Sequence, residues 1–256
     1  MIRLIIERLF RNTILKRRLP STFGSIPLYV SPDAQLKYLK FSFDNDLLRI
    51  ASTYIRNDSV VWDIGANIGV FALAAATITT TGYVLAIEPD IWLANIISKS
   101  LTLRVNLNLH VHVLPIAISD INGATTFLIA KRGRASNALE SVGGRSQMGG
   151  IRQKVLVPTL TIDTLLDSCP APTFIKIDVE GAELQVLKGG YRLLTEIRPI
   201  IYIEVGSTVA TEITTLLLEN SYLLFDGSIP YSASNSLSEC VFNTLAIPEE
   251  QVADLS

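Results

Sequence analysis

The sequence is poor in the residues that build metal sites and disulfide frameworks. Only two of its 256 residues are cysteine and two are histidine. Cys169 and Cys240 lie far apart without zinc-type spacing, so we predict ordinary buried thiols in a reducing, cytoplasmic compartment. His110 and His112 have no further metal ligand near them in the sequence. We expect structural or surface roles for both histidines.

Aromatic side chains are also scarce, and neither acidic nor basic residues are in large excess. Aromatic residues make up 7% of the chain, and the formal net charge is −2. Proteins that coat nucleic acid or flip a base out of a duplex need a basic surface and aromatic side chains that hold the bases. The composition therefore argues against nucleic acid as a partner.

Long hydrophobic runs are absent, although the mean hydropathy of +0.37 is high. No stretch reaches the roughly 18 uninterrupted apolar residues of a membrane-spanning helix. The segment from Met1 to Phe10 has the pattern of a basic amphipathic helix. We expect its apolar stripe to pack on the domain or on a partner, which leaves a homo-oligomer open, and peripheral membrane contact is the less favoured alternative. The basic residues of this region, opposed only by Glu7, are Arg3, Arg8, Arg11, Lys16, Arg17 and Arg18.

From Ser59 onward, short apolar runs alternate with helical patterns. Such alternation is typical of βαβ units. It predicts an α/β fold that is Rossmann-like and doubly wound, with a mainly parallel sheet and helices on both faces. Residues 1–55, broken by three prolines, are predicted as a helical and loop-rich N-terminal extension, and 56–256 as the α/β domain. The predicted strands cover 60–64, 84–88, 111–117, 125–130, 155–157, 174–178 and 200–204, and the predicted helices cover 70–78 and 91–103.

Four acids stand at the C-terminal ends of predicted strands, namely Asp63, Glu88, Asp178 and Glu204. Because ligands of parallel α/β sheets bind beyond the carboxyl ends of the strands, we expect these side chains to converge on a ligand site. The segment 132–153 is rich in glycine and has little apolar periodicity. We predict a mobile loop over the same edge of the sheet.

The strongest local signal is the turn Asp-Ile-Gly-Ala-Asn-Ile-Gly at positions 63 to 69. Gly65 and Gly69 allow a sharp turn and a close approach to a ligand, and the helix that follows offers its positive N-terminus to an anion. The GxxxG spacing differs from the GxGxxG of dinucleotide-binding turns, and it suits the carboxylate of a methionine moiety. Glu88 is placed to accept both hydroxyls of a ribose, in S-adenosylmethionine or in NAD.

With these residues in place, the sequence resembles the FkbM family of methyltransferases over roughly residues 60–205. Its most characteristic block is Ile-Lys-Ile-Asp-Val-Glu-Gly-Ala-Glu at positions 175 to 183. The resemblance implies a class I fold, S-adenosylmethionine as methyl donor with S-adenosylhomocysteine as product, and O-methylation of a hydroxyl on a small molecule, sugar or natural product. The matching blocks are 61–69, 86–89, 117–120 with Gly123, 157–163, 175–183, 186–189, 198–199 and 203–204.

The resemblance also implies a donor site. The methionine end of the donor would lie along the glycine turn, the ribose on Glu88, and the adenine beside the backbone of Ala117 and Ile118. Residues 131–153 match only loosely, so the family's acceptors do not carry over. The residues assigned to the donor site are Asp63, Gly65, Ala66, Asn67, Gly69, Glu88, Pro89, Ala117 and Ile118.

Methyl transfer to a hydroxyl is an in-line displacement that benefits from a general base. The candidates are Asp178, Glu180 and Glu204. Lys176 lies two residues before Asp178 and on the same strand face, where it either stabilises the forming alkoxide or makes a structural ion pair. Mg²⁺ held by Asp178 and Glu204 is a minority alternative, because nothing in the spacing requires a metal.

Three other functions compete with this interpretation. A non-catalytic S-adenosylmethionine-binding module would tolerate the loss of Gly65, Glu88, Asp178 or Glu180, and all four are present. An NAD-dependent oxidoreductase predicts a GxGxxG turn, which the sequence lacks. A nucleic-acid methyltransferase would carry an NPPY-type acceptor motif, which is also absent.

Overall fold

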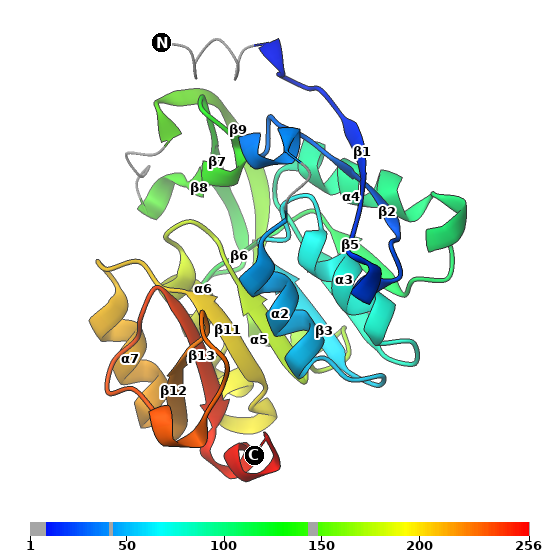
Figure 1. Cartoon of the computed structure of the whole chain (residues 1–256). Helices are drawn as coiled ribbons and strands as arrows, with labels where there is room; N and C mark the ends of the chain where they lie inside the picture. The colour runs from blue at the N-terminus through cyan, green and yellow to red at the C-terminus, as the bar shows by residue number, and fades with distance from the viewer. Residues whose placement is uncertain (1–8, 41–42, 143–147, 256) are drawn as a thin grey trace.

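The computed structural model describes residues 9–40, 43–142 and 148–255, and its centre is a seven-stranded sheet (Figure 1). The strand order is β12-β13-β11-β10-β3-β4-β5. β13 is antiparallel to both of its neighbours, and the other adjacent strands are parallel. The predicted mainly parallel α/β sheet is confirmed. The sequence analysis did not predict its strands β12 and β13. The bounds are β3 (Val60–Ile64), β4 (Tyr83–Ile87), β5 (Val111–Leu114), β10 (Phe174–Ile177), β11 (Ile200–Glu204), β12 (Tyr222–Asp226) and β13 (Asn243–Pro248).

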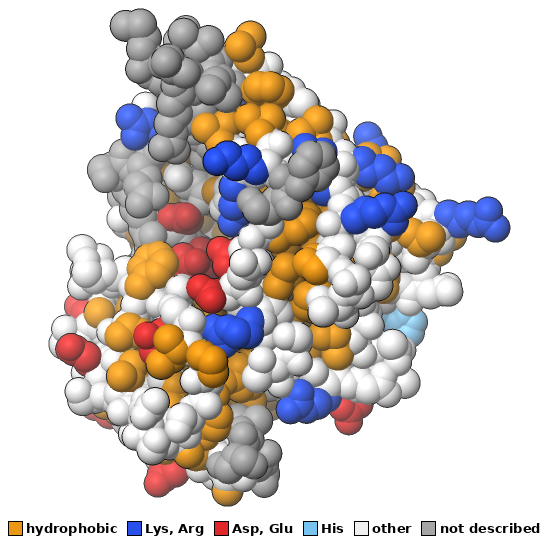
Figure 2. Space-filling view, viewed as in Figure 1, with side chains coloured by type: hydrophobic (Ala, Val, Ile, Leu, Met, Phe, Trp, Pro, Cys, Tyr) orange, Lys and Arg blue, Asp and Glu red, His pale blue; other side chains and the backbone are white. Residues whose placement is uncertain are grey.

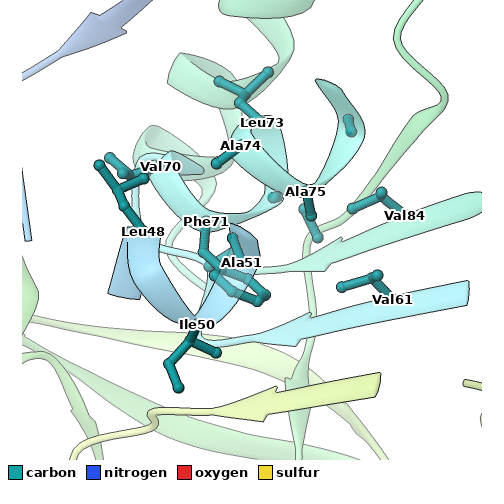
Figure 3. Close-up of a cluster of buried hydrophobic side chains, with 14 of the residues drawn as sticks. Leu48, Ile50, Ala51, Val61, Val70, Phe71, Leu73, Ala74, Ala75 and Val84 are labelled. Carbon is teal, nitrogen blue, oxygen red and sulfur yellow. The ribbon is translucent and has the colours of Figure 1, made fainter. Parts of the chain in front are cut away.

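Helices cover both faces of this sheet, because side chains alternate along each strand and the inner strands carry mainly apolar residues toward both faces. On β3, Val61 packs into the cluster on one face, and Trp62 packs into the cluster on the other. Figure 3 shows Leu48 and Ala51 packed with Phe71 on the first face. The first face carries α2 (Asn45–Tyr54), α3 (Val70–Ile78) and α4 (Ile91–Leu101), and the second carries α5 (Ile162–Leu166), α6 (Glu183–Lys188) and α7 (Ala210–Glu219).

A second, four-stranded sheet in the order β6-β9-β7-β8 stands beside the carboxyl ends of the central strands (Figure 1). The segment 132–153 contributes β8 and the start of β9 to this sheet, and its side chains Ala138, Leu139 and Met148 are buried against β7. The prediction of a mobile loop is therefore wrong for these residues, because their apolar side chains pack on β7 despite the many glycines around them. The bounds are β6 (Ala117–Ile118), β7 (Gly123–Ala130), η4 (Arg134–Ser136), β8 (Ala138–Leu139), η5 (Glu140–Val142) and β9 (Ile151–Leu160).

The N-terminal extension contains a hairpin of β1 (Leu15–Arg18) and β2 (Pro27–Val30), which the prediction of helix and loop did not include. Pro27 opens an edge strand, a position where a missing N–H is tolerated. β2 packs on α4, and the Tyr29 N–H donates to Ser100 Oγ at 2.8 Å. The predicted basic helix at Met1 to Phe10 lies almost entirely outside the described residues.

Two further expectations are that the cysteines form no disulfide and that the chain has no membrane-spanning helix. Both cysteines are free thiols, with Cys240 buried and Cys169 half-buried. Within the described ranges, no helix combines the length and apolarity needed to cross a bilayer.

Candidate active site

The glycine turn joins β3 to α3 and lies directly against the end of β10. Gly65 has a φ of +78°, and a Cβ added to it would lie 1.8 Å from the carbonyl oxygen of Asp178. The Gly65 and Ala66 N–H groups both donate to the Ile87 carbonyl at 3.0 Å, which fixes the turn over β4. Gly69, with a φ of +81°, is the N-cap of α3. Only glycine fits at position 65, because both the conformation and the close approach exclude a side chain.

Asp63 and Lys176 form a buried ion pair beneath this turn. They are direct partners in the register of β3 and β10, and Lys176 Nζ lies 3.0 Å from Asp63 Oδ1. Lys176 also donates to the Gly65 carbonyl at 3.1 Å and lies 3.7 Å from Asp178 Oδ2. Burial favours the neutral amine, but Asp63 and Asp178 outweigh it and raise the pKa of Lys176 above its ordinary value. The predicted contact with Asp178 is present, and the primary partner is Asp63.

Glu88 directly follows the last residue of β4 and is 5% exposed. Its two oxygens accept backbone hydrogen bonds from Asn67 and Asp90, each at 2.8 Å. Burial raises the pKa of Glu88 to about 8. Each oxygen keeps a free lone pair, so the carboxylate can accept two further hydrogen bonds from a ligand.

Asp90 and Asp33 connect three parts of the fold beside Glu88. Asp90 Oδ2 accepts from Arg134 Nη1 at 2.5 Å and from Asn137 Nδ2 at 2.8 Å. Asp33, in the N-terminal extension, pairs with Arg152 at 2.6 Å and with Arg134 at 3.4 Å. Burial opposes the charge on Asp33, but Arg152 and Arg134 hold its pKa below the ordinary value. We call this group the Asp33–Asp90–Arg134 clasp, and it joins the extension, α4 and the second sheet.

The first pocket, of about 620 Å³, opens between the glycine turn, Glu88 and the second sheet. Of the predicted donor-site residues, Gly65, Asn67, Glu88, Pro89, Ala117 and Ile118 line it. Asp63, Ala66 and Gly69 do not; Asp63 is fully buried under the turn, and its Oδ2 accepts from the Ala72 N–H at 3.1 Å. The remaining lining residues are Gln35, Ile64, Ile87, Ile116, Phe127, Arg134, Ala135, Asn137, Leu139, Asp178, Val179, Glu180 and Ala182.

A second pocket, of about 810 Å³, lies on the other side of the glycine turn. It contains three of the predicted catalytic residues, Lys176, Asp178 and Glu204. Burial, reinforced by the neighbouring Asp178, raises the pKa of Glu204 to about 8. Acidic side chains gather near the middle of the face shown in Figure 2. The two pockets share Gln35, Gly65, Asn67 and Asp178.

Several lining residues escaped the sequence analysis. Gln35, Tyr38 and Asp44 come from the N-terminal extension, where no motif marks them. Arg134 and Asn137 come from the segment that was predicted to be a loop. A usable signal existed for Asp44, and also for Asp90 beside the first pocket, since an aspartate directly before a helix is a typical N-cap.

The part of the chain that the structure describes contains no cluster of metal-binding side chains. No group of three or more histidine, cysteine or acidic side chains there is arranged to hold an ion. His112 stacks on Tyr83 with ring centroids 4.5 Å apart, and His110 lies in a separate surface groove.

Comparison with known proteins places this chain in a family. The profile of the methyltransferase FkbM domain matches residues 63–224, more than half of the chain. The protein therefore belongs to the FkbM methyltransferase family, as the sequence blocks predicted.

Individual relatives agree with this placement. The hexuronic acid methyltransferase AglP of Haloferax volcanii is 27% identical over 184 residues, which cover 70% of each chain. The crystal structure of an FkbM methyltransferase from Methylobacillus flagellatus aligns with a TM-score of 0.51 and 17% identity. That alignment covers 94% of this chain and 50% of the other, so the present chain spans about half of that protein's length. At this identity the structural match supports the fold, and a Rossmann-like methyltransferase fold is confirmed.

Proposed function

We propose that the protein transfers the methyl group of S-adenosylmethionine to a hydroxyl of a sugar or another small polyhydroxyl compound. The observation that carries this proposal is the meeting of two pockets at Asp178, on the carboxyl edge of the sheet. One pocket has the lining of a nucleoside site, and the other is lined mainly by polar groups and opens beside it at Asp178. The family and the sugar-type substrate named for the Haloferax relative support the same reaction.

The lining of the first pocket fits the donor. Glu88 offers two free lone pairs to the ribose hydroxyls, and Ile118, Phe127 and Leu139 provide apolar surface for a purine. The Oδ1 atom of Asn67 is buried and has no hydrogen-bond partner in the described structure. An amide oxygen in that position accepts a hydrogen bond from an ammonium group such as that of the methionine moiety. Bound there, the donor supplies an electrophilic methyl group on a sulfonium.

We assign the general base to Asp178, because it is the predicted acid that lines both pockets and is not fully buried. Its carboxylate takes the proton of the acceptor hydroxyl while that oxygen bonds to the methyl carbon and the carbon–sulfur bond breaks. Lys176 positions Asp178 and is held by Asp63, so it is a positioning residue in this scheme. Glu204 lies in the second pocket and is placed to contact the acceptor.

Donor binding is tested by calorimetric titration of S-adenosylhomocysteine into wild type and Glu88→Ala. We expect micromolar binding that weakens tenfold or more in the variant, which corresponds to about 1.4 kcal/mol. NAD is titrated alongside, and a preference for NAD would refute the donor assignment.

Transfer is tested with labelled S-adenosylmethionine and a panel of sugars and polyols. Asp178→Asn is expected to reduce turnover by roughly 10²–10⁴-fold while leaving S-adenosylhomocysteine affinity unchanged. Binding without transfer to any acceptor would favour the non-catalytic module instead.

A further inference from the structure

Acidic groups outnumber basic groups in the lining of the second pocket. Five carboxyl groups and two ammonium groups line it. The carboxyl groups come from different parts of the fold, because α2 brings its first turn next to the ends of β3, β10 and β11. The acids are Asp44, Asp46, Asp63, Asp178 and Glu204, and the bases are Lys37 and Lys176.

Both bases are already engaged by acids of this chain. Lys176 is 4% exposed and is held between Asp63, at 3.0 Å, and Asp178, at 3.7 Å. Lys37 lies 3.6 Å from Asp44. Both ammonium groups therefore already have a carboxylate partner within this chain. Glu204 has no ion-pair partner within 4 Å in the described structure, and its pKa is raised to about 8, so a protonated amine of a ligand beside it would favour its ionised form.

The uncharged polar groups of the pocket favour a ligand that donates hydrogen bonds. The side-chain oxygens of Gln35 and Asn243 are buried and have no hydrogen-bond partner in the described structure. Each is an acceptor, so its natural partner is a hydroxyl or an N–H group of the ligand. A carboxylate brings only further acceptors, and it would leave these oxygens unsatisfied at a cost in affinity.

We propose that the second pocket selects a polyhydroxyl acceptor without a carboxylate or phosphate, and that a protonated amine on the acceptor strengthens its binding. This inference rests on the proposed function, because it names the acceptor class of the same site. It separates this protein from its Haloferax relative, whose name specifies a hexuronic acid. Like charges that meet in a partly enclosed site oppose binding, and opposite charges favour it.

Three probes that share one ring test the charge preference. Methyl β-D-glucopyranoside, D-glucosamine and D-glucuronate are titrated at low ionic strength into protein saturated with S-adenosylhomocysteine, and binding is followed by saturation-transfer NMR. We expect glucosamine and the glucoside to bind at least tenfold more tightly than glucuronate, with glucosamine the tighter of the two. Raising the salt to 1 M, where the Debye length falls to roughly 3 Å, should narrow the difference.

A charge-reversal variant tests whether this pocket is the source of the preference. Asp46 lies at the pocket rim in the first turn of α2, with its side chain 47% exposed and 3.7 Å from the guanidinium group of Arg49. Asp46→Lys should reduce the discrimination against glucuronate at least threefold and leave S-adenosylhomocysteine affinity unchanged. Asp58→Lys makes the same change of net charge at an exposed turn before β3, outside both pockets, and should leave the discrimination unaltered.

The outcomes separate the two proposals. If S-adenosylhomocysteine does not bind, the proposed function fails, and the acceptor class fails with it. If it binds but glucuronate matches or exceeds the other two probes, only the acceptor class is overturned. The acceptor class is also overturned if none of the three probes binds, or if Asp46→Lys and Asp58→Lys change the discrimination equally.

Discussion

Nucleoside binding should depend on pH through Glu88. Burial raises the pKa of this carboxyl to about 8; the nearby Asp90 adds to the shift, and Lys176 and two backbone N–H groups oppose it. A ribose that donates two hydroxyls to the carboxylate favours its ionised form and lowers its pKa in the complex. Affinity should therefore be highest above pH 8 and fall as the pH drops below it.

The magnitude follows from the ionised fraction. A carboxyl with a pKa of about 8 is roughly 90% ionised at pH 9 and roughly 3% ionised at pH 6.5. If the bound form stays ionised over this range, affinity changes by roughly 30-fold, or about 2 kcal/mol. Because the carboxylate must lose a proton before the ribose can use it fully, binding at pH 6.5 should be accompanied by proton release.

The assay uses 5′-methylthioadenosine, which lacks the α-amino group that would titrate near pH 8 in the complete donor. Calorimetry between pH 6.5 and 9, in buffers of different ionisation enthalpy, gives both the affinity and the number of protons released. Glu88→Gln removes the titrating group and should bind weakly and nearly independently of pH. A flat profile in wild type, or an equal slope in Glu88→Gln, would refute the reasoning.

Three further predictions concern the parts that hold the site. Gly65→Ala should lower the free energy of unfolding by at least about 2 kcal/mol in urea titrations and abolish donor binding, because its Cβ would lie 1.8 Å from a carbonyl oxygen. Lys176→Met should cost about 3–5 kcal/mol in the same assay, because it leaves the buried Asp63 without its partner; a loss below about 1 kcal/mol would contradict the ion-pair assignment. Arg134→Ala should weaken S-adenosylhomocysteine binding roughly tenfold (about 1.4 kcal/mol) in calorimetry, whereas Lys154→Ala, which removes an exposed ion pair with Glu140, should have no effect.

The central strands could be predicted because both of their faces are buried. The apolar runs at 60–64 and 200–204 coincide with β3 and β11, and the alanine-rich run at 70–78 coincides with α3. The hairpin at 15–30 could not be predicted, because its strands have four residues each and depend on packing against α4. Short edge elements take their conformation from tertiary contacts rather than from their own pattern.

The donor side of the site was more accessible to sequence analysis than the acceptor side. Gly65, Asn67 and Glu88 belong to one continuous βαβ unit, so local spacing specifies their arrangement. The acceptor side combines Tyr38 and Asp46 from the N-terminal extension with residues more than a hundred positions away. No local sequence pattern indicates that these residues lie together. The packing of α2 on α3 places Asp46 at the pocket.

The strand-end acids look alike in the sequence, and what distinguishes them is how many of their lone pairs the fold already uses. Asp63 gives one oxygen to Lys176 and the other to the Ala72 N–H, and it is fully buried, so both of its oxygens are used in holding the turn. Glu88 accepts one backbone hydrogen bond on each oxygen and still faces the first pocket. Asp178 is 30% exposed and lies where both pockets meet. In the proposed scheme, these differences assign Asp63 to building the site, Glu88 to binding the donor and Asp178 to moving a proton.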